Sequence, residues 1–225
     1  MTDKTCVSIG VSSPAKLKSD LTKALNKSDY AELRLDFLEP SQIPNFLNSI
    51  KKHLRRCICT LRPKSEGGKF PGTEKERVSI LKLIAEFDPY LLDVEYNTLK
   101  NKIELYRFLK TNKVNLLVSW HDFSKTPSKE FLKNITKRMS RFSKNIKIVT
   151  TAQTIGDTLR ILTLYKQVPT STNLIAFAMG DYGRMSRILC IRLGSPFTYV
   201  SLGKPIAPGQ FSLEEMQSIA NLQKY

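Results

Sequence analysis

Eight short apolar segments alternate with amphipathic segments along the whole chain, and no other feature limits the possible folds as strongly. Short runs rich in β-branched and aromatic residues are typical of buried strands, and a spacing of three to four residues is typical of helices. Strands are expected at Cys6–Gly10, Tyr30–Phe37, Arg56–Leu61, Tyr90–Glu95, Asn115–His121, Ile146–Thr151, Leu174–Met179 and Phe197–Ser201. Helices are expected at Pro14–Asn26, Ser41–Lys52, Thr73–Phe87, Leu99–Lys110, Ser128–Met139, Ile155–Tyr165 and Met185–Arg192, and from Ser212 towards Tyr225.

Eight strand–helix units without a linker or inserted repeat favour an α/β fold, a single-domain (β/α)8 TIM barrel over residues 1–225. A chain of 225 residues is long enough for one such domain. A doubly wound open sheet is the main alternative, and it usually has a glycine-rich phosphate loop after its first strand. Here that turn reads Gly10-Val11-Ser12-Ser13-Pro14. The sequence therefore favours the barrel.

The net charge of +16 is the one unusual bulk property of the chain. Between Lys100 and Lys147, only Glu104, Asp122 and Glu130 offset a long series of lysines and arginines. Such a segment is common in nucleic-acid-binding proteins. The chain nevertheless lacks regularly spaced stacking aromatics, zinc fingers and other nucleic-acid motifs. We expect solvated helix faces, no nucleic-acid partner and a mild attraction for anionic small molecules.

Cellular location and metal content can also be inferred from what the sequence contains. No apolar run approaches the roughly 20 residues that cross a bilayer, and the first segment is too short and wrongly flanked for a signal peptide. The cysteines are too scattered for a disulfide framework, and with only two histidines they make a poor zinc site. These residues are Cys6, Cys57, Cys59, Cys190, His53 and His121. We expect a cytoplasmic protein without a membrane partner or a metal.

Charged residues alternate with apolar residues in the second expected strand. Glu32, Arg34 and Asp36 share one face, opposite Leu33 and Leu35. Since the apolar face of a barrel strand packs against helices, the charged face is expected to point inwards. A structural ion-pair network and a binding site are equally good explanations of these residues alone.

Polar residues at the ends of other strands favour the binding site, because barrel active sites lie at the carboxyl ends of the strands. Arg62 and Glu66 follow the third strand, and His121 ends the fifth, where a general base is wanted. In the sixth strand, alternation places Lys147 opposite Ile146 and therefore inwards. A desolvated amine there is a candidate nucleophile for an imine. A structural histidine and a solvated lysine are the ordinary alternatives.

In order along the chain, these residues and several others resemble type I 3-dehydroquinate dehydratase (3-dehydroquinase). The motifs are Glu32-Leu33-Arg34-Leu35-Asp36, Thr60-Leu61-Arg62 with Glu66-Gly67-Gly68, Ser119-Trp120-His121-Asp122-Phe123, Lys147-Ile148, Met179-Gly180-Asp181-Tyr182-Gly183-Arg184-Met185-Ser186-Arg187, Gly194-Ser195 and Ala207-Pro208-Gly209-Gln210. Each motif is weak alone, but their order and spacing together are specific. The resemblance covers essentially the whole chain.

The resemblance implies a lyase of the shikimate pathway of aromatic amino acid biosynthesis, which needs no cofactor. Lys147 would form a Schiff base with the ketone of 3-dehydroquinate, His121 would move the protons of a syn elimination, and Glu66 would tune His121. Arg187 would bind the substrate carboxylate. Contacts to the remaining polar groups of the substrate would come from Ser8, Glu32, Arg34, Arg62 and Gln210. The resemblance also implies a homodimer.

Two alternatives stay open on the sequence alone. Another lysine-imine barrel lyase, of the class I aldolase type, would also use Lys147, but not the combined set of the other motifs. A barrel that has lost its activity and binds an anionic polymer would have no physical need to keep Lys147, His121, Arg187 and Gln210. One departure from the family pattern is Ile206, where relatives often have a serine. A missing hydroxyl contact there would cost roughly 1 kcal/mol.

Overall fold

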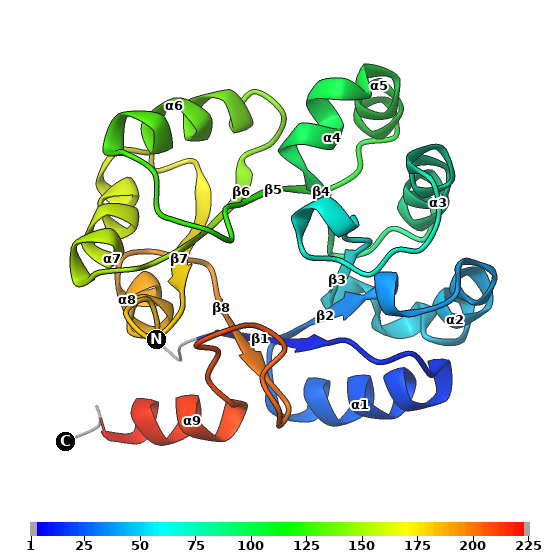
Figure 1. Ribbon diagram of the computed structural model, residues 1–225. Helices are drawn as coiled ribbons and strands as arrows, with labels where there is room; N and C mark the ends of the chain where they lie inside the picture. The colour runs from blue at the N-terminus through cyan, green and yellow to red at the C-terminus, as the bar shows by residue number, and fades with distance from the viewer. Residues whose placement is uncertain (1–3, 223–225) are drawn as a thin grey trace. The chain divides into compact units, whose positions relative to one another are not determined.

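The computed structural model describes residues 4–222 and contains two compact units (Figure 1). The N-terminal unit is Ile9–Val118, and the C-terminal unit joins Met1–Ser8 to Ser119–Tyr225. Both units alternate strands with helices. Two strands contribute to both units, namely β1 (Thr5–Ile9) and β5 (Leu116–His121).

The N-terminal unit is built around three parallel strands in the order β4-β3-β2. These are β2 (Tyr30–Arg34), β3 (Cys57–Thr60) and β4 (Leu91–Glu95). The α-helices are α1 (Pro14–Lys27), α2 (Ile43–Ser49), α3 (Glu74–Glu86), α4 (Tyr96–Asn101) and α5 (Ile103–Thr111). Short 3-10 turns are η1 (Leu35–Phe37), η2 (Pro40–Gln42), η3 (Lys51–Arg56) and η4 (Lys64–Glu66). The pairing aligns Arg34 with Thr60 and Thr60 with Asp93, which brings polar side chains of three strands to one level.

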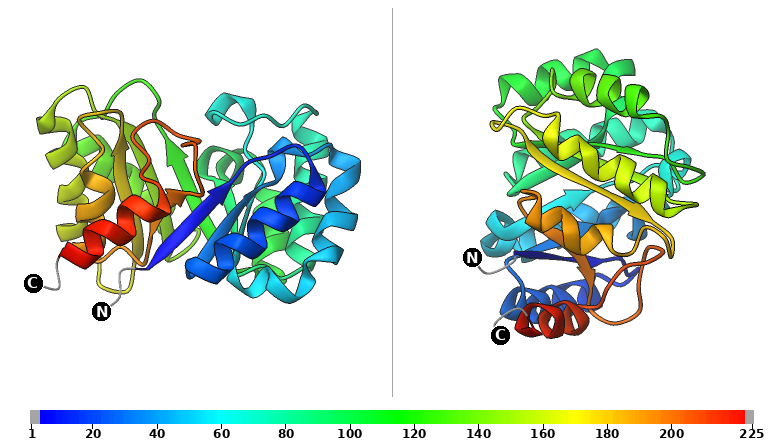
Figure 2. Two further views of the ribbon diagram at one scale, coloured as in Figure 1. Left: turned by 90° about the horizontal axis from the view of Figure 1, so that it is seen from below. Right: turned by 90° about the vertical axis from the view of Figure 1, so that its left-hand side faces the viewer.

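In the C-terminal unit, β6 (Asn145–Thr151) and β7 (Asn173–Met179) run parallel and in register along their full length. The strand β8 (Thr198–Ser201) pairs with β1 in the same sense. The helical segments are α6 (Lys129–Met139), α7 (Ile155–Leu162), η5 (Thr163–Lys166), α8 (Ser186–Arg192) and α9 (Leu213–Leu222). Figure 2 shows α7 and α8 packed on β7, where both helices make extensive contacts.

Local signals in the sequence explain where several helices begin. Ser128 accepts a hydrogen bond from the backbone of Phe131 and starts α6 as expected. Ser212 and Glu215 bond each other's backbone N–H groups before α9, which is the reciprocal capping box that the sequence suggests. The last residues of that expected helix, 223–225, lie outside the described residues. No helix within residues 4–222 is both long and apolar enough to cross a membrane.

All eight expected strands are found, but the second is shorter than expected. The strand ends at Arg34, and η1 follows. The prediction that Asp36 continues the face of a strand is therefore wrong. The physical reason is a turn held by this carboxylate, which accepts two hydrogen bonds from the Arg34 guanidinium and a third from the backbone N–H of Lys69.

The expected helix Leu99–Lys110 is in fact two helices, α4 and α5. They meet at Lys102, whose φ of −122° and ψ of 69° are not helical. Whether the whole chain forms a single domain stays a prediction.

Candidate active site

Lys147 lies in β6 and is buried, with 5% of its surface exposed. Its neighbours Ile146 and Ile148 are also buried, because the strand has covered faces on both sides. The ammonium lies over the ring of Tyr199 from β8, with Nζ 4.4 Å from the ring centroid. The lysine that strand alternation singles out is therefore not a solvated surface side chain.

Arg187 in α8 is the most unusual charged residue of the C-terminal unit, because only 2% of it is exposed. No carboxylate pairs with it in the part of the chain that the structure describes. Its guanidinium stacks on Phe177 of β7 at 4.3 Å and donates one hydrogen bond, 3.2 Å long, to the carbonyl of Pro208. Burial lowers the pKa of Arg187 to about 10. A buried cation without an acidic partner is costly, so it favours an anionic ligand.

The Ala207-Pro208-Gly209-Gln210 segment is a tight turn between β8 and α9. Gln210 donates its backbone N–H to the Ala207 carbonyl, and its side-chain oxygen accepts the N–H of Ile206. Gly209 has a φ of +70°, and a Cβ on it would lie 2.8 Å from the carbonyl oxygen of Gly180. Only glycine satisfies both conditions. The turn brings the Pro208 carbonyl to Arg187 and buries Gln210.

His121 ends β5 and is half-buried, with the ring of Phe123 stacked 5.9 Å from its own. The loop behind it is fixed to β6 at two points. The Asp122 backbone N–H donates to the Val149 carbonyl at 2.9 Å, and the Thr151 hydroxyl donates to the Asp122 carbonyl at 3.1 Å. These bonds hold the histidine-bearing end of β5 against the strand that carries the candidate nucleophile.

Ser8 is buried near the end of β1, aligned with Ser201 of β8. The C-terminal unit thus contains five of the expected site residues: Ser8, His121, Lys147, Arg187 and Gln210. Four others lie in the N-terminal unit: Glu32, Arg34, Arg62 and Glu66.

In the N-terminal unit, Arg62 is held by two carboxylates of β4. It donates to Asp93 at 2.7 Å and to Glu95 at 2.8 Å, and all three side chains are buried. Arg77 of α3 donates to the other oxygen of Glu95 at 2.8 Å. Burial works to lower the pKa of Arg62, but Asp93 and Glu95 outweigh it and raise the pKa. Arg62 is therefore a fixed, permanently charged donor.

Glu32 and Arg34 add charged side chains from β2 to the polar groups of β3 and β4. The Thr60 hydroxyl of β3 donates to the buried carboxylate of Glu32 at 2.9 Å. Arg34 forms a two-bond ion pair with Asp36, at 2.9 Å and 2.8 Å. Burial lowers the pKa of Arg34, yet Asp36 and Glu32 raise it overall. These groups offer both donors and acceptors, as a polyhydroxylated ligand requires.

Glu66 is a buried carboxyl at the end of η4 that accepts a 3.2 Å hydrogen bond from Asn97. Gly67 follows in the left-handed conformation, and a Cβ on Gly68 would collide with the Arg62 carbonyl. The two glycines therefore allow the loop to fold back onto Arg62. Burial, together with the charge of Glu95, raises the pKa of Glu66 to about 7. A carboxyl that titrates near neutrality is suited to exchanging or regulating a proton.

This pKa predicts a pH-dependent stability. Because the folded pKa lies above the ordinary value of 4.5, the contribution of Glu66 is fully present below about pH 4.5 and is lost as the pH rises through about 7. Between pH 5 and pH 8 the wild type should lose roughly 2 to 3 kcal/mol more of its free energy of unfolding than Glu66→Gln. Urea denaturation of both proteins at the two pH values measures this. Equal losses of unfolding free energy in the wild type and in Glu66→Gln would show that Glu66 ionises with an ordinary pKa.

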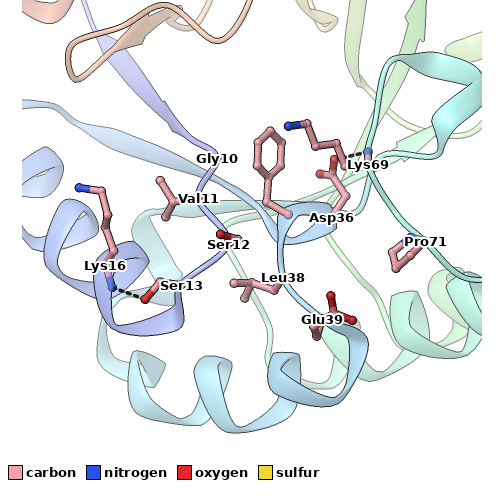
Figure 3. A pocket seen from close by; sticks show the side chains of 11 residues that line it. Gly10, Val11, Ser12, Ser13, Lys16, Asp36, Leu38, Glu39, Lys69 and Pro71 are labelled. Carbon is pink, nitrogen blue, oxygen red and sulfur yellow. Dashed lines mark hydrogen bonds between the residues drawn. The ribbon is translucent and has the colours of Figure 1, made fainter.

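A separate cavity of about 530 Å³ lies in the N-terminal unit, beside the loops that follow β1, β2 and β3 (Figure 3). Its lining includes the ammonium-bearing Lys16 and Lys69 and the carboxylates of Asp36 and Glu39. No expected site residue lines it. The mixed charges favour neither an anion nor a cation, and no ligand is assigned to this cavity.

Three residues that contact the expected site residues were not predicted from the sequence, namely Asp93, Glu95 and Tyr199. Asp93 and Glu95 alternate with Leu92 and Val94 in a strand, so the same reasoning as for β2 would have found them. Tyr199 carries no such signal, because an aromatic residue in a short strand is ordinary core.

Comparison with known proteins decides the family. The model of the type I 3-dehydroquinase family matches residues 5–225. The chain belongs to the type I 3-dehydroquinase family. A 3-dehydroquinate dehydratase of Dehalococcoides mccartyi is 39% identical to it over 209 residues, which are 90% of this chain and 91% of the relative. The 3-dehydroquinate dehydratase of Methanocaldococcus jannaschii is 33% identical over 222 residues, 96% and 97% of the two chains.

Solved structures of the family confirm the expected fold class, an α/β (β/α)8 barrel. The 3-dehydroquinate dehydratase of Geobacillus kaustophilus matches with a TM-score of 0.89 and 23% identity, covering 100% of this chain and 93% of its own. The type I enzyme of Clostridium difficile, solved with covalently modified comenic acid, has a TM-score of 0.88 and 26% identity over 98% of this chain and 92% of its own.

Proposed function

We propose that the protein catalyses the dehydration of 3-dehydroquinate to 3-dehydroshikimate, as a hydro-lyase of the shikimate pathway. Family membership over almost the whole chain supports this, as does the name 3-dehydroquinate dehydratase of a relative that is 39% identical. The observation that carries the proposal is that one unit contains both a buried lysine, Lys147, and a buried arginine, Arg187, which lacks a carboxylate partner among the described residues. A keto acid offers a carbonyl to the first and a carboxylate to the second.

The proposed reaction begins at the amine of Lys147. The nitrogen adds to the C3 ketone, and loss of water leaves a protonated imine that withdraws electrons from C2. His121 removes the C2 proton, and the resulting enamine expels the C1 hydroxyl, which leaves as water with the proton from His121. Water then hydrolyses the imine and releases the enone. No cofactor is needed, because the imine is the electron sink.

Binding roles are proposed for the remaining residues. Arg187 binds the substrate carboxylate. The hydroxyls are bound by Ser8, Glu32, Arg34, Arg62 and Gln210. Glu66, whose pKa is raised to about 7, is suited to regulating a proton. Ile206 offers an apolar side chain where relatives often have serine, so its contribution to substrate binding is its backbone contact with Gln210.

One experiment tests the function. The protein is mixed with 3-dehydroquinate while the absorbance of the conjugated enone is followed, and sodium borohydride is then added before intact and peptide mass are measured. Enone formation and a reduced adduct on Lys147 are expected. Folded protein that gives neither would overturn the proposal. An aldolase-type lyase would instead form an imine with other keto substrates and cleave a carbon–carbon bond without enone formation from 3-dehydroquinate.

Arg187→Met should weaken the use of substrate without weakening the fold. Loss of charge-assisted hydrogen bonds to the carboxylate is expected to lower kcat/KM roughly 100-fold, mainly through KM. Removing a buried charge with no carboxylate partner should leave the thermal midpoint unchanged or raise it. Steady-state kinetics and thermal unfolding measure the two effects. A large fall in the midpoint would show that Arg187 is mainly structural.

We also propose a homodimer in the cytoplasm. Exposed apolar side chains lie on α7, at Ile155 and Leu159, and at the start of α8, at its N-cap Met185 and at Leu189 one turn later. Leu159 is 59% exposed. Patches of this kind commonly mark protein interfaces. Leu159→Glu should convert a dimer into a monomer in light scattering after size exclusion, whereas Lys166→Glu on η5 should not. A monomeric wild type would contradict the proposal.

A further inference from the structure

Two aromatic rings connect the two buried cations of the C-terminal unit. Arg187 lies over Phe177 at 4.3 Å, the centroids of Phe177 and Tyr199 are 6.3 Å apart, and the ammonium of Lys147 lies over Tyr199 at 4.4 Å. Each cation therefore has its own ring. Neither ring contributes an ionisable group to the proposed chemistry.

Packing fixes the ring of Tyr199 in this position. Phe197, which directly precedes β8, meets it edge-on at 5.5 Å with the planes at 76°. Phe177 meets it at 54° from β7. All three rings are buried, and Tyr199 is aligned with Cys6 of β1 through strand pairing. The face of the ring is thus held towards Nζ before any ligand binds.

A buried ring face attracts positive charge through its quadrupole, and the attraction grows when water is excluded. In the proposed reaction the nitrogen attacks as a neutral amine and carries positive charge in the protonated imine that follows. The ring stabilises the cationic imine and not the neutral amine. Relative to the attacking amine, its effect is therefore concentrated on the protonated imine, which must persist while the C2 proton leaves.

We infer that Tyr199 stabilises the protonated imine on Lys147 through the face of its ring, with no role for its hydroxyl in the chemistry. The inference rests on the proposed function, because it assumes that Lys147 forms the imine. It assigns a reaction-specific role to a residue that otherwise resembles ordinary core. Filling space alone would require only an apolar side chain of similar volume.

The test replaces Tyr199 with phenylalanine and then with 4-fluoro-, 3,5-difluoro- and 3,4,5-trifluorophenylalanine, introduced by suppression of a stop codon. These rings have nearly the same shape but progressively weaker quadrupoles. Tyr199→Phe should retain the wild-type imine fraction within about 2-fold, and the trifluoro ring should lower the imine equilibrium constant about 10-fold, with a steady trend between them. The imine fraction is measured by borohydride trapping and mass spectrometry over a range of 3-dehydroquinate concentrations.

The same series at Phe197 is the matched control, because that ring packs against Tyr199 just before β8, whereas the Lys147 ammonium lies over Tyr199. The imine equilibrium constant is expected to stay the same across the Phe197 variants. Unfolding midpoints of every variant are measured, and a purely structural role would change the midpoints without a graded change in the imine fraction. If the imine equilibrium constant stayed the same across the Tyr199 variants, in protein that still traps substrate, this inference alone would be overturned. Absence of any adduct on Lys147 in the wild type would overturn the proposed function as well.

Discussion

Lys147→Ala is expected to abolish the covalent adduct and to lower kcat by about 10⁵-fold or more, the scale seen when a covalent nucleophile is removed. Without the imine, the C2 proton is acidified only by a neutral ketone, so the elimination loses its electron sink. Enone absorbance measures turnover, and mass spectrometry after borohydride treatment measures the adduct. Substrate should still bind through Arg187, which equilibrium dialysis with labelled substrate can detect.

Lys144→Ala is the matched control, since this exposed lysine directly precedes β6 and lies only three positions away. It should trap substrate and turn over like the wild type. Lys147→Met keeps much of the buried volume and separates lost chemistry from a packing defect. If Lys147→Met retained turnover, or if the adduct moved to another lysine, the assignment of the nucleophile would be wrong.

His121→Ala should separate imine formation from turnover. Removal of a general base commonly costs 10²- to 10⁴-fold, so kcat should fall by about 10³-fold. The amine of Lys147 remains, and the variant should accumulate a trappable imine of unchanged substrate mass. The measurement is the mass of the reduced adduct, which distinguishes bound 3-dehydroquinate from the dehydrated product.

His53→Ala provides the comparison, because His53 and His121 are the only histidines of the chain. His53 lies in η3, and burial together with neighbouring Lys52 and Arg56 lowers its pKa. Its loss should leave kcat unchanged. Normal turnover by His121→Ala would require another proton carrier, and the assignment of His121 as the base would be wrong.

Local patterns predicted the strands well and their ends less well. The alternation around Lys147 spans only a few residues, and a buried strand with that spacing needs no information from elsewhere in the chain. The end of β2 depends instead on Asp36, which bonds the nearby Arg34 and also the backbone of Lys69, far away in sequence. A turn held by a distant backbone N–H cannot be read from the residues that form it.

The candidate site residues were also predictable only in part from the sequence. Arg62 and Glu66 were identifiable because polar residues directly after a strand are informative in this fold class. The surroundings of Arg62 and Glu66 could not be predicted, because the pairing of Arg62 with Asp93 and Glu95 requires β3 and β4 to be neighbours in a definite register. The raised pKa of Glu66 follows from that environment rather than from its own position.

The sequence by itself determined the order of strands and helices and the family, and its alternation favoured an inward position for Lys147. Periodicity and motif order are properties of the chain, and they persist whatever the chain packs against. Only the tertiary structure decided that Arg187 is buried without a carboxylate partner in the described residues, and that Lys147 faces the ring of Tyr199. These features join β6, β7, β8 and α8, and charge burial and cation–ring attraction depend on distances between elements that no local pattern specifies.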